Sequence, residues 1–127
     1  MKKLATLLLA ILTVLSVLTL SACGPKKEDG TEVSITVIVV DDRGEETKYE
    51  LTTTRAYLAD ALLDEKLASG TTTVEYGLMI NTVDGILADW NVNGAYWAIY
   101  VGDEMAMVGA SSIELADGGL YRLVYTK

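Results

Sequence analysis

Apolar and polar residues alternate in the segment that follows residue 32. In residues 33–40 every second position is apolar, at Val33, Ile35, Val37 and Val39. A period of two places these side chains on one face of a half-buried strand. Residues 41–46 have the composition of a turn, and residues 47–53 return with Tyr49 and Leu51 on one face. The pattern therefore predicts a β-hairpin.

The period changes to that of a helix in residues 54–70. Leu58, Ala61 and Leu62 fall on one helical stripe, which needs a sheet to cover it. Thr54 is of the type that caps a helix N-terminus, and Gly70 is of the type that ends a helix. We expect one helix of about three to four turns here.

The second half of the chain has the pattern of strands again. Residues 76–86 contain a strand that ends at the turn pair Asp84 and Gly85, and residues 120–127 contain the last strand. Between them, Asn93 and Gly94 separate two apolar segments, which is the strongest short-range signal for a hairpin. The order strand, strand, helix, strands predicts one small α+β domain.

A two-residue turn at Asn93 and Gly94 fixes which side chains share a face. In that register Trp90 lies opposite Trp97 on the apolar core face. The opposite face carries a mixed set of aromatic and polar side chains, Asp89, Asn91, Tyr96 and Tyr100. Such a set suits a binding surface, but tyrosines also suit the plain outside of a sheet, and both readings stay open. A longer turn would turn Trp90 and Trp97 to the binding face instead.

The N-terminus has the features of a lipoprotein signal peptide. Lys2 and Lys3 precede an uncharged apolar stretch over residues 4–20, and "LSAC" at residues 20–23 resembles a bacterial lipobox. We therefore expect a cleaved signal peptide at residues 1–22, lipidated Cys23 with a flexible tether at residues 23–32, and a domain at residues 33–127. A transmembrane anchor is the alternative, because the apolar run approaches the length of a membrane span.

The charge of the chain argues against nucleic acid as a partner. The 18 acidic and 10 basic residues give a net charge of −8. Loss of residues 1–22 would remove two of the lysines and make the net charge more negative. A chain this acidic is repelled by phosphate backbones. The simplest interpretation of this negative charge is that it keeps the protein soluble.

The residue inventory excludes most catalytic chemistries. The chain has no histidine, and Cys23 is its only cysteine. An imidazole base, a histidine metal ligand and a Ser-His-Asp arrangement are therefore excluded. Paired carboxylates such as Asp103 and Glu104 leave a hydrolase as the remaining enzymatic option. We expect a binding protein that is not an enzyme and that has neither a metal nor a cofactor.

Several motifs in the second half resemble a known family. The segments "YGLMINTVDGI" and "YWAIYVGDEMAMVGASSIELADGGLYRLVY" are similar to bacterial lipoprotein domains related to the C-terminal domain of transcobalamin and intrinsic factor. The positions that match are Gly77, Ile80, Gly85, Tyr96, Trp97, Tyr100, Ala106, Gly109, Leu115, Asp117, Gly118 and Tyr125. The resemblance extends over residues 33–127 and is most specific over residues 76–125. Gly102, Asp103 and Gly119 depart from the family pattern at turn positions.

This resemblance implies a β-grasp-like fold and a role in ligand binding. By analogy with the vitamin carriers, the protein would be an extracytoplasmic, membrane-anchored lipoprotein that captures cobalamin or another corrinoid for a nearby vitamin importer. The ligand would contact the mixed face described above and the two methionines Met105 and Met107, whose side chains adapt to shape. The alternative is an envelope protein-interaction or adhesion module without a small-molecule ligand.

Overall fold

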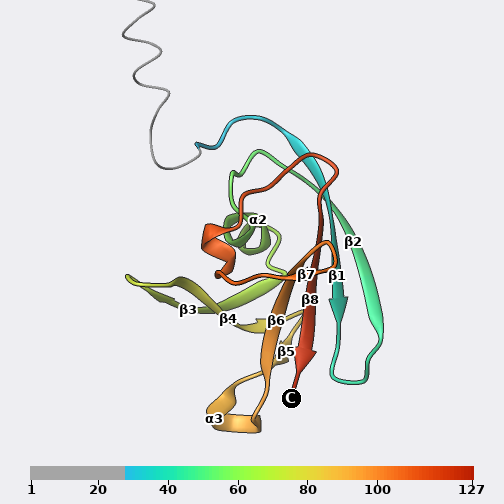
Figure 1. The fold of residues 1–127 in the computed structure, drawn as a ribbon, viewed down its shortest axis with the longest axis vertical. Coiled ribbons are helices and arrows are strands. Elements are labelled where there is room, and N and C mark those ends of the chain that lie inside the picture. Colours follow the sequence, from blue (N-terminus) through green and yellow to red (C-terminus); the bar gives the residue numbers. More distant parts are fainter. Residues whose placement is uncertain (1–27) are drawn as a thin grey trace, which may run out of the picture.

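Two β-sheets, two short helices and one 3₁₀ turn form the described domain (Figure 1). The computed structural model describes residues 28–127, so the predicted signal peptide and the predicted lipidation site Cys23 lie outside the described residues. The α+β class is confirmed, with most of the regular structure in strands.

The larger sheet has five strands in the order β2-β1-β8-β6-β7. The predicted hairpin is confirmed as β1 (Val33–Val40) and β2 (Glu46–Thr53), with Val37 paired to Tyr49. The last strand, β8 (Leu120–Thr126), runs parallel to β1 and antiparallel to β6 (Tyr96–Val101). Strand β7 (Glu104–Met105) closes this edge of the sheet. The final segment of the chain is thus the central strand.

The smaller sheet and the helices lie on one side of the five-stranded sheet (Figure 1). Its three strands are β3 (Ala68–Thr73), β4 (Gly77–Val83) and β5 (Ile86–Leu87). Helix α2 (Leu58–Asp64) and the 3₁₀ turn η1 (Ala110–Ser112) lie beside them. A short helical turn, α3 (Trp90–Asn93), connects β5 to β6 at the opposite end of the molecule from the N-terminal segment.

The core fills the space between the two sheets and α2. Alternate residues of β1 are buried as their period predicts, and Leu58 and Leu62 of α2 are fully buried. Tyr121 and Leu123 of β8 are buried on the same side of the sheet. No buried side-chain nitrogen or oxygen within residues 28–127 lacks a hydrogen-bond partner.

The predicted helix over residues 54–70 is wrong at both ends. Helix α2 begins after Tyr57 rather than after Thr54, and it ends at Asp64. Lys66 adopts a left-handed conformation with φ of 55°, while the amides of Lys66 and Leu67 donate to the carbonyls of Leu63 and Leu62. These two bonds form the Schellman motif that terminates helices. The chain then continues as β3, in which Gly70 forms part of a β-bulge.

The predicted hairpin at Asn93 and Gly94 is also wrong. Gly94, with φ of 65°, follows the C-terminus of α3 and does not form a two-residue turn between paired strands. Strand β6 pairs with β8 and β7, whereas β5 pairs with β4. Consequently Trp90 and Trp97 are not cross-strand partners. The turn predicted at Asp84 and Gly85 does connect β4 to β5, and both residues have positive φ.

Candidate functional site

The residues predicted for ligand binding fall into separate regions of the structure. Tyr96 and Tyr100 alternate along β6 and lie on the face of the large sheet opposite the core. Met105 pairs with Tyr100 and shares this outer face. Tyr96 is exposed and Tyr100 is half-buried, so tyrosine side chains cover part of this outer face.

Trp97 belongs to the core and is only 6% exposed. Its Nε1–H donates to the carbonyl of Ile86 at 3.2 Å, and its ring meets that of Tyr125 edge-on with centroids 5.6 Å apart. A buried tryptophan needs such a partner for its N–H. Trp97 therefore joins the two sheets.

Three other predicted residues lie on or next to α3. Asp89 caps this turn, because its carboxylate accepts from the amide of Asn91 at 2.9 Å. The amide of Asp89 in turn donates to the side-chain oxygen of Asn93 at 2.9 Å. Trp90 is 69% exposed at the tip of the molecule, away from Trp97. The polar groups of Asp89 and Asn93 are thus used to build the turn.

A hollow in apolar surroundings lies elsewhere, between the β3–β4 hairpin and the loop before η1. It has a volume of about 510 Å³, and we call it the hairpin groove. The groove is lined by Glu75, Tyr76, Met79, Met107, Val108, Gly109 and Ser112. A second hollow of about 460 Å³ shares Glu75, Tyr76 and Ser112 with it and extends along Val74, Gly77, Ser111, Glu114 and Tyr57. Both therefore lie around the tip of one hairpin.

Large apolar side chains are exposed around this tip. Met107 is 93% exposed, Tyr76 is 67% exposed and Met79 is 52% exposed. Val74 and Val108 are exposed as well. Contiguous exposed apolar surface usually marks a binding site in a soluble domain. Methionine side chains suit such a site because they are flexible and polarizable.

Hydrogen bonds and a close backbone approach hold the groove in shape. The amide of Leu78 donates to Oγ of Ser111 at 3.0 Å, which joins the start of β4 to η1. The amide of Tyr76 donates to Oγ1 of Thr73 at 3.1 Å within the hairpin turn. Gly77 has φ of 68°, and a Cβ added there would lie 2.6 Å from Cβ and Oγ of Ser111. The two walls of the groove are therefore fixed relative to each other.

Sequence reasoning found only one residue of the hairpin groove, Met107. Tyr76 and Val74 lie in a turn between strands, where apolar residues are unusual, and this was the signal that could have revealed them. Met79 lies on the face of β4 away from the buried Leu78. The predicted partner of Met107, Met105, lies on the outer face of the large sheet instead.

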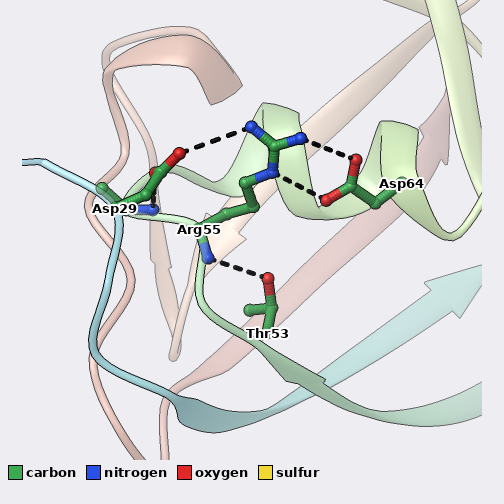
Figure 2. A network of polar contacts seen from close by, with 5 residues as sticks. Asp29, Thr53, Arg55 and Asp64 are labelled. Carbon is green, nitrogen blue, oxygen red and sulfur yellow. Dashed lines mark hydrogen bonds and ion pairs between the residues drawn. The ribbon is translucent and has the colours of Figure 1, made fainter.

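An ion-pair network joins the N-terminal described residues to the domain (Figure 2). Arg55 donates from Nε and Nη2 to the carboxylate of Asp64 at 2.8 and 3.2 Å, and from Nη1 to Asp29 at 3.4 Å. Asp29 also accepts from the amide of Ala56 at 2.7 Å. The hydrogen bond with Asp64 raises the pKa of Arg55 above its ordinary value. All these groups have structural partners, so the network holds residue 29 against the start of α2.

The part of the chain that the structure describes, residues 28–127, has no group of three or more histidine, cysteine, aspartate or glutamate side chains arranged to hold a metal ion. Nor does it contain a helix with the length and apolar character needed to cross a bilayer.

Comparison with known proteins gives a family and a fold. Residues 56–119 match the family described as a domain of unknown function, DUF4430. A candidate metal-binding protein from Ruminococcus gnavus ATCC 29149, known from its crystal structure, is 33% identical with a TM-score of 0.70. That comparison covers 75% of this chain and 97% of the other. No curated protein matches this chain.

Haptocorrin of the transcobalamin family, solved in complex with cobinamide, has a TM-score of 0.62 at 19% identity. The comparison covers 84% of this chain but only 28% of haptocorrin. At this identity the likeness concerns the fold alone, and it confirms the expected transcobalamin-like fold. From the family match and the relative in Ruminococcus gnavus, the chain belongs to the DUF4430 family.

Proposed function

We propose that this protein binds a small organic ligand in the hairpin groove, as an extracytoplasmic lipoprotein held at a membrane through Cys23. The observation that carries the proposal is a hollow of about 510 Å³ walled by exposed apolar side chains. Ligand sites are typically concave, mostly apolar and supplied with a few polar groups. Here the polar groups are the phenol of Tyr76, the carboxylate of Glu75 and the hydroxyl of Ser112.

A corrinoid is the first ligand class to test. The similarity in fold to haptocorrin, which was solved with cobinamide, supports this choice. The chain has no histidine that could coordinate cobalt, so the ligand would be held by contact area and by hydrogen bonds to its amide groups. A single shallow site must also offset the entropy lost by the ligand, so we expect a dissociation constant of about micromolar.

The lipobox-like residues 20–23 support the membrane-anchored part of the proposal. Lipid chains on Cys23 would hold the domain at the membrane surface, because each buried methylene contributes about 0.8 kcal/mol. From that position a captured ligand could pass to a vitamin importer in the same membrane. The protein would then act in uptake without transforming its cargo.

Titration of aquacyanocobinamide and cyanocobalamin into the protein lacking residues 1–22 tests this function. We expect a change in the visible spectrum, or co-elution, at micromolar protein. Tyr76→Ala and Met107→Ala should weaken capture about tenfold each and leave thermal stability nearly unchanged, because both side chains are exposed.

Tyr96→Ala and Tyr100→Ala are the matched controls for the choice of surface. They truncate tyrosines on the outer face of the large sheet, and capture should survive both substitutions. If capture is lost in these variants but not in Tyr76→Ala, the ligand binds the face predicted from the sequence. Absence of binding to either corrinoid at high micromolar protein would reject the corrinoid.

A specific observation also favours protein interaction as a second candidate function. Strand β3 pairs only with β4 among the described strands, and five of its six residues are exposed. It has no charged residue, whereas the edge strand β2 carries Glu46, Lys48 and Glu50. Charged side chains normally protect sheet edges from pairing with other chains. A photo-crosslinker at Thr72 that captures one envelope protein in intact cells, together with no corrinoid binding, would favour this alternative.

A further inference from the structure

The charged groups that line the two hollows at the hairpin tip are all acidic. Glu75 lines both hollows and Glu114 lines the second. No lysine or arginine is among the lining residues of either hollow. An anionic ligand would therefore meet carboxylates without a compensating cation.

Four of the six basic side chains in residues 28–127 are already engaged, and the other two, Lys66 and Lys127, line neither hollow. Ion pairs with carboxylates involve Arg43, Lys48, Arg55 and Arg122. No ion pair within residues 28–127 involves Glu75 or Glu114. The whole chain has a net charge of −8, so the field of more distant charges has the same sign as these two carboxylates.

The ring of Tyr76 adds a second feature that favours a cation. It is 67% exposed and lines both hollows next to Glu75. The face of an aromatic ring attracts ammonium and guanidinium groups, and the attraction grows when the pair is partly shielded from water. Met79 and Met107 line the same hollow and offer apolar surface to the uncharged part of a ligand, which would shield the pair from water once the ligand is bound.

We infer that the hairpin groove selects an apolar organic ligand that carries a positive charge and rejects anionic ligands, with Glu75 as the counter-charge. The inference rests on the proposed function, because it assumes that the groove is the binding site. It adds the chemical class of the ligand and the residue that discriminates between classes. The apolar body of the ligand lies against the methionines, while its cationic group reaches the carboxylate of Glu75 and the ring of Tyr76.

Two dyes with the same xanthene ring system test the inference: rhodamine 6G is cationic and fluorescein is anionic at neutral pH. Fluorescence anisotropy of each dye is measured during titration with the protein lacking residues 1–22, whose folding is checked by circular dichroism. We expect rhodamine 6G to bind at least tenfold more tightly than fluorescein at low salt. The ratio should fall severalfold in 0.5 M NaCl, because a partly exposed ion pair is screened.

Substitutions separate charge selection from contact area. Glu75→Gln keeps the size of the side chain. It should reduce the ratio of the affinities for rhodamine 6G and fluorescein to threefold or less. Met107→Ala should weaken both dyes by a similar factor and leave the ratio unchanged. Glu104→Gln is the matched control, because Glu104 is an exposed acid on β7 that lines neither hollow. In Glu104→Gln, the ratio of the affinities for rhodamine 6G and fluorescein should equal that of the unchanged protein.

Three results would overturn the inference: fluorescein binding as tightly as rhodamine 6G, a ratio that Glu75→Gln does not change, or no binding of either dye. The corrinoid titration keeps this failure separate from that of the proposed function. Corrinoid capture without a preference between the dyes leaves ligand binding intact and rejects charge selection. Selective binding of rhodamine 6G without corrinoid capture supports charge selection and rejects the corrinoid.

Discussion

Trp97 and Trp90 are seven residues apart but have opposite environments. Trp97 is 6% exposed and is hydrogen-bonded across the core, whereas Trp90 is 69% exposed. We expect Trp97→Ala to lower the free energy of unfolding by about 3–5 kcal/mol, since it leaves a large cavity. Trp90→Ala should change it by no more than about 0.5 kcal/mol. Urea denaturation measures both, and equal losses would contradict the structure.

Gly77 shows how a backbone position controls the shape of the groove. It needs a positive φ, and an added Cβ would lie 2.6 Å from Ser111. Gly102 also has a positive φ, but a Cβ there would meet open space. Gly77→Ala should therefore destabilise the fold by about 1–3 kcal/mol more than Gly102→Ala, which bears only the conformational cost.

The readout for this pair is thermal denaturation followed by ligand titration. The displaced Ser111 should also weaken its bond with Leu78 and thereby weaken binding in the groove. Gly102→Ala should bind ligand normally once it is folded. Identical stability of the two variants would show that η1 can move aside without cost.

At the scale of elements, the sequence was sufficient to predict a strand where the period of its apolar residues is compatible with only one kind of secondary structure. The alternation in residues 33–53 could form only a half-buried hairpin, and the last strand had the same signature. The end of the helix could not be predicted, because Lys66 takes the left-handed position that glycine usually occupies. A non-glycine residue in that position gives no signal in the sequence.

The dipeptide Asn93–Gly94 could not be assigned from the sequence for a different reason. A glycine with positive φ suits a two-residue hairpin turn and the end of a helix equally well. The capping bonds between Asp89, Asn91 and Asn93 decide in favour of the helix. These polar residues resembled ligand contacts in the sequence because caps and binding sites use the same side chains.

The candidate site was largely missed because it is not local in sequence. Residues 74–79 form one wall and residues 107–112 the other. Only the docking of η1 onto the start of β4 brings these walls together. Exposure of Tyr76 and Met79 is likewise a product of tertiary structure, since a periodicity argument assigns such residues to a core.

One hydrogen bond links strand β2 to the turn between β4 and β5 and gives a pH dependence. Tyr49 donates its phenol proton to Oδ2 of Asp84 at 2.7 Å, and this bond raises the pKa of Tyr49 above 10.0. A raised pKa in the folded state means that the stabilisation is complete below about pH 10 and is lost as pH rises through the folded-state value.

The stability of the protein between about pH 9 and 12 should therefore fall more steeply than that of Tyr49→Phe. The phenylalanine variant lacks the titrating phenol and serves as the control for other groups. Chemical denaturation at a series of pH values gives the two slopes. Parallel slopes would show that Tyr49 does not hold its proton through Asp84.

At the scale of the whole molecule, the contacts of Asp29 would set how far the domain lies from a lipid anchor at Cys23. Asp29 binds Arg55 and the amide of Ala56 near the start of α2 (Figure 2). If Cys23 is lipidated, residues 24–28 can separate the lipid from Asp29 by about 20 Å at most. Helix α3 lies at the opposite end of the domain and would then point away from the membrane (Figure 1).

Cys23→Ser should move the protein from the membrane fraction to the soluble fraction, because two or more acyl chains are needed for stable anchoring. Incorporation of labelled palmitate should disappear in the same variant. Ser21→Thr is a control that keeps the thiol. Persistence of the serine variant in the membrane fraction would favour a transmembrane anchor over a lipid anchor.

The position of β8 has a consequence for how the domain folds. This strand is hydrogen-bonded to β1 on one side and to β6 on the other, although β1 is far from β8 in sequence. Contacts between segments so far apart have a high loop-closure cost. We therefore expect the five-stranded sheet to assemble late, after the local hairpins β1–β2 and β3–β4 have formed.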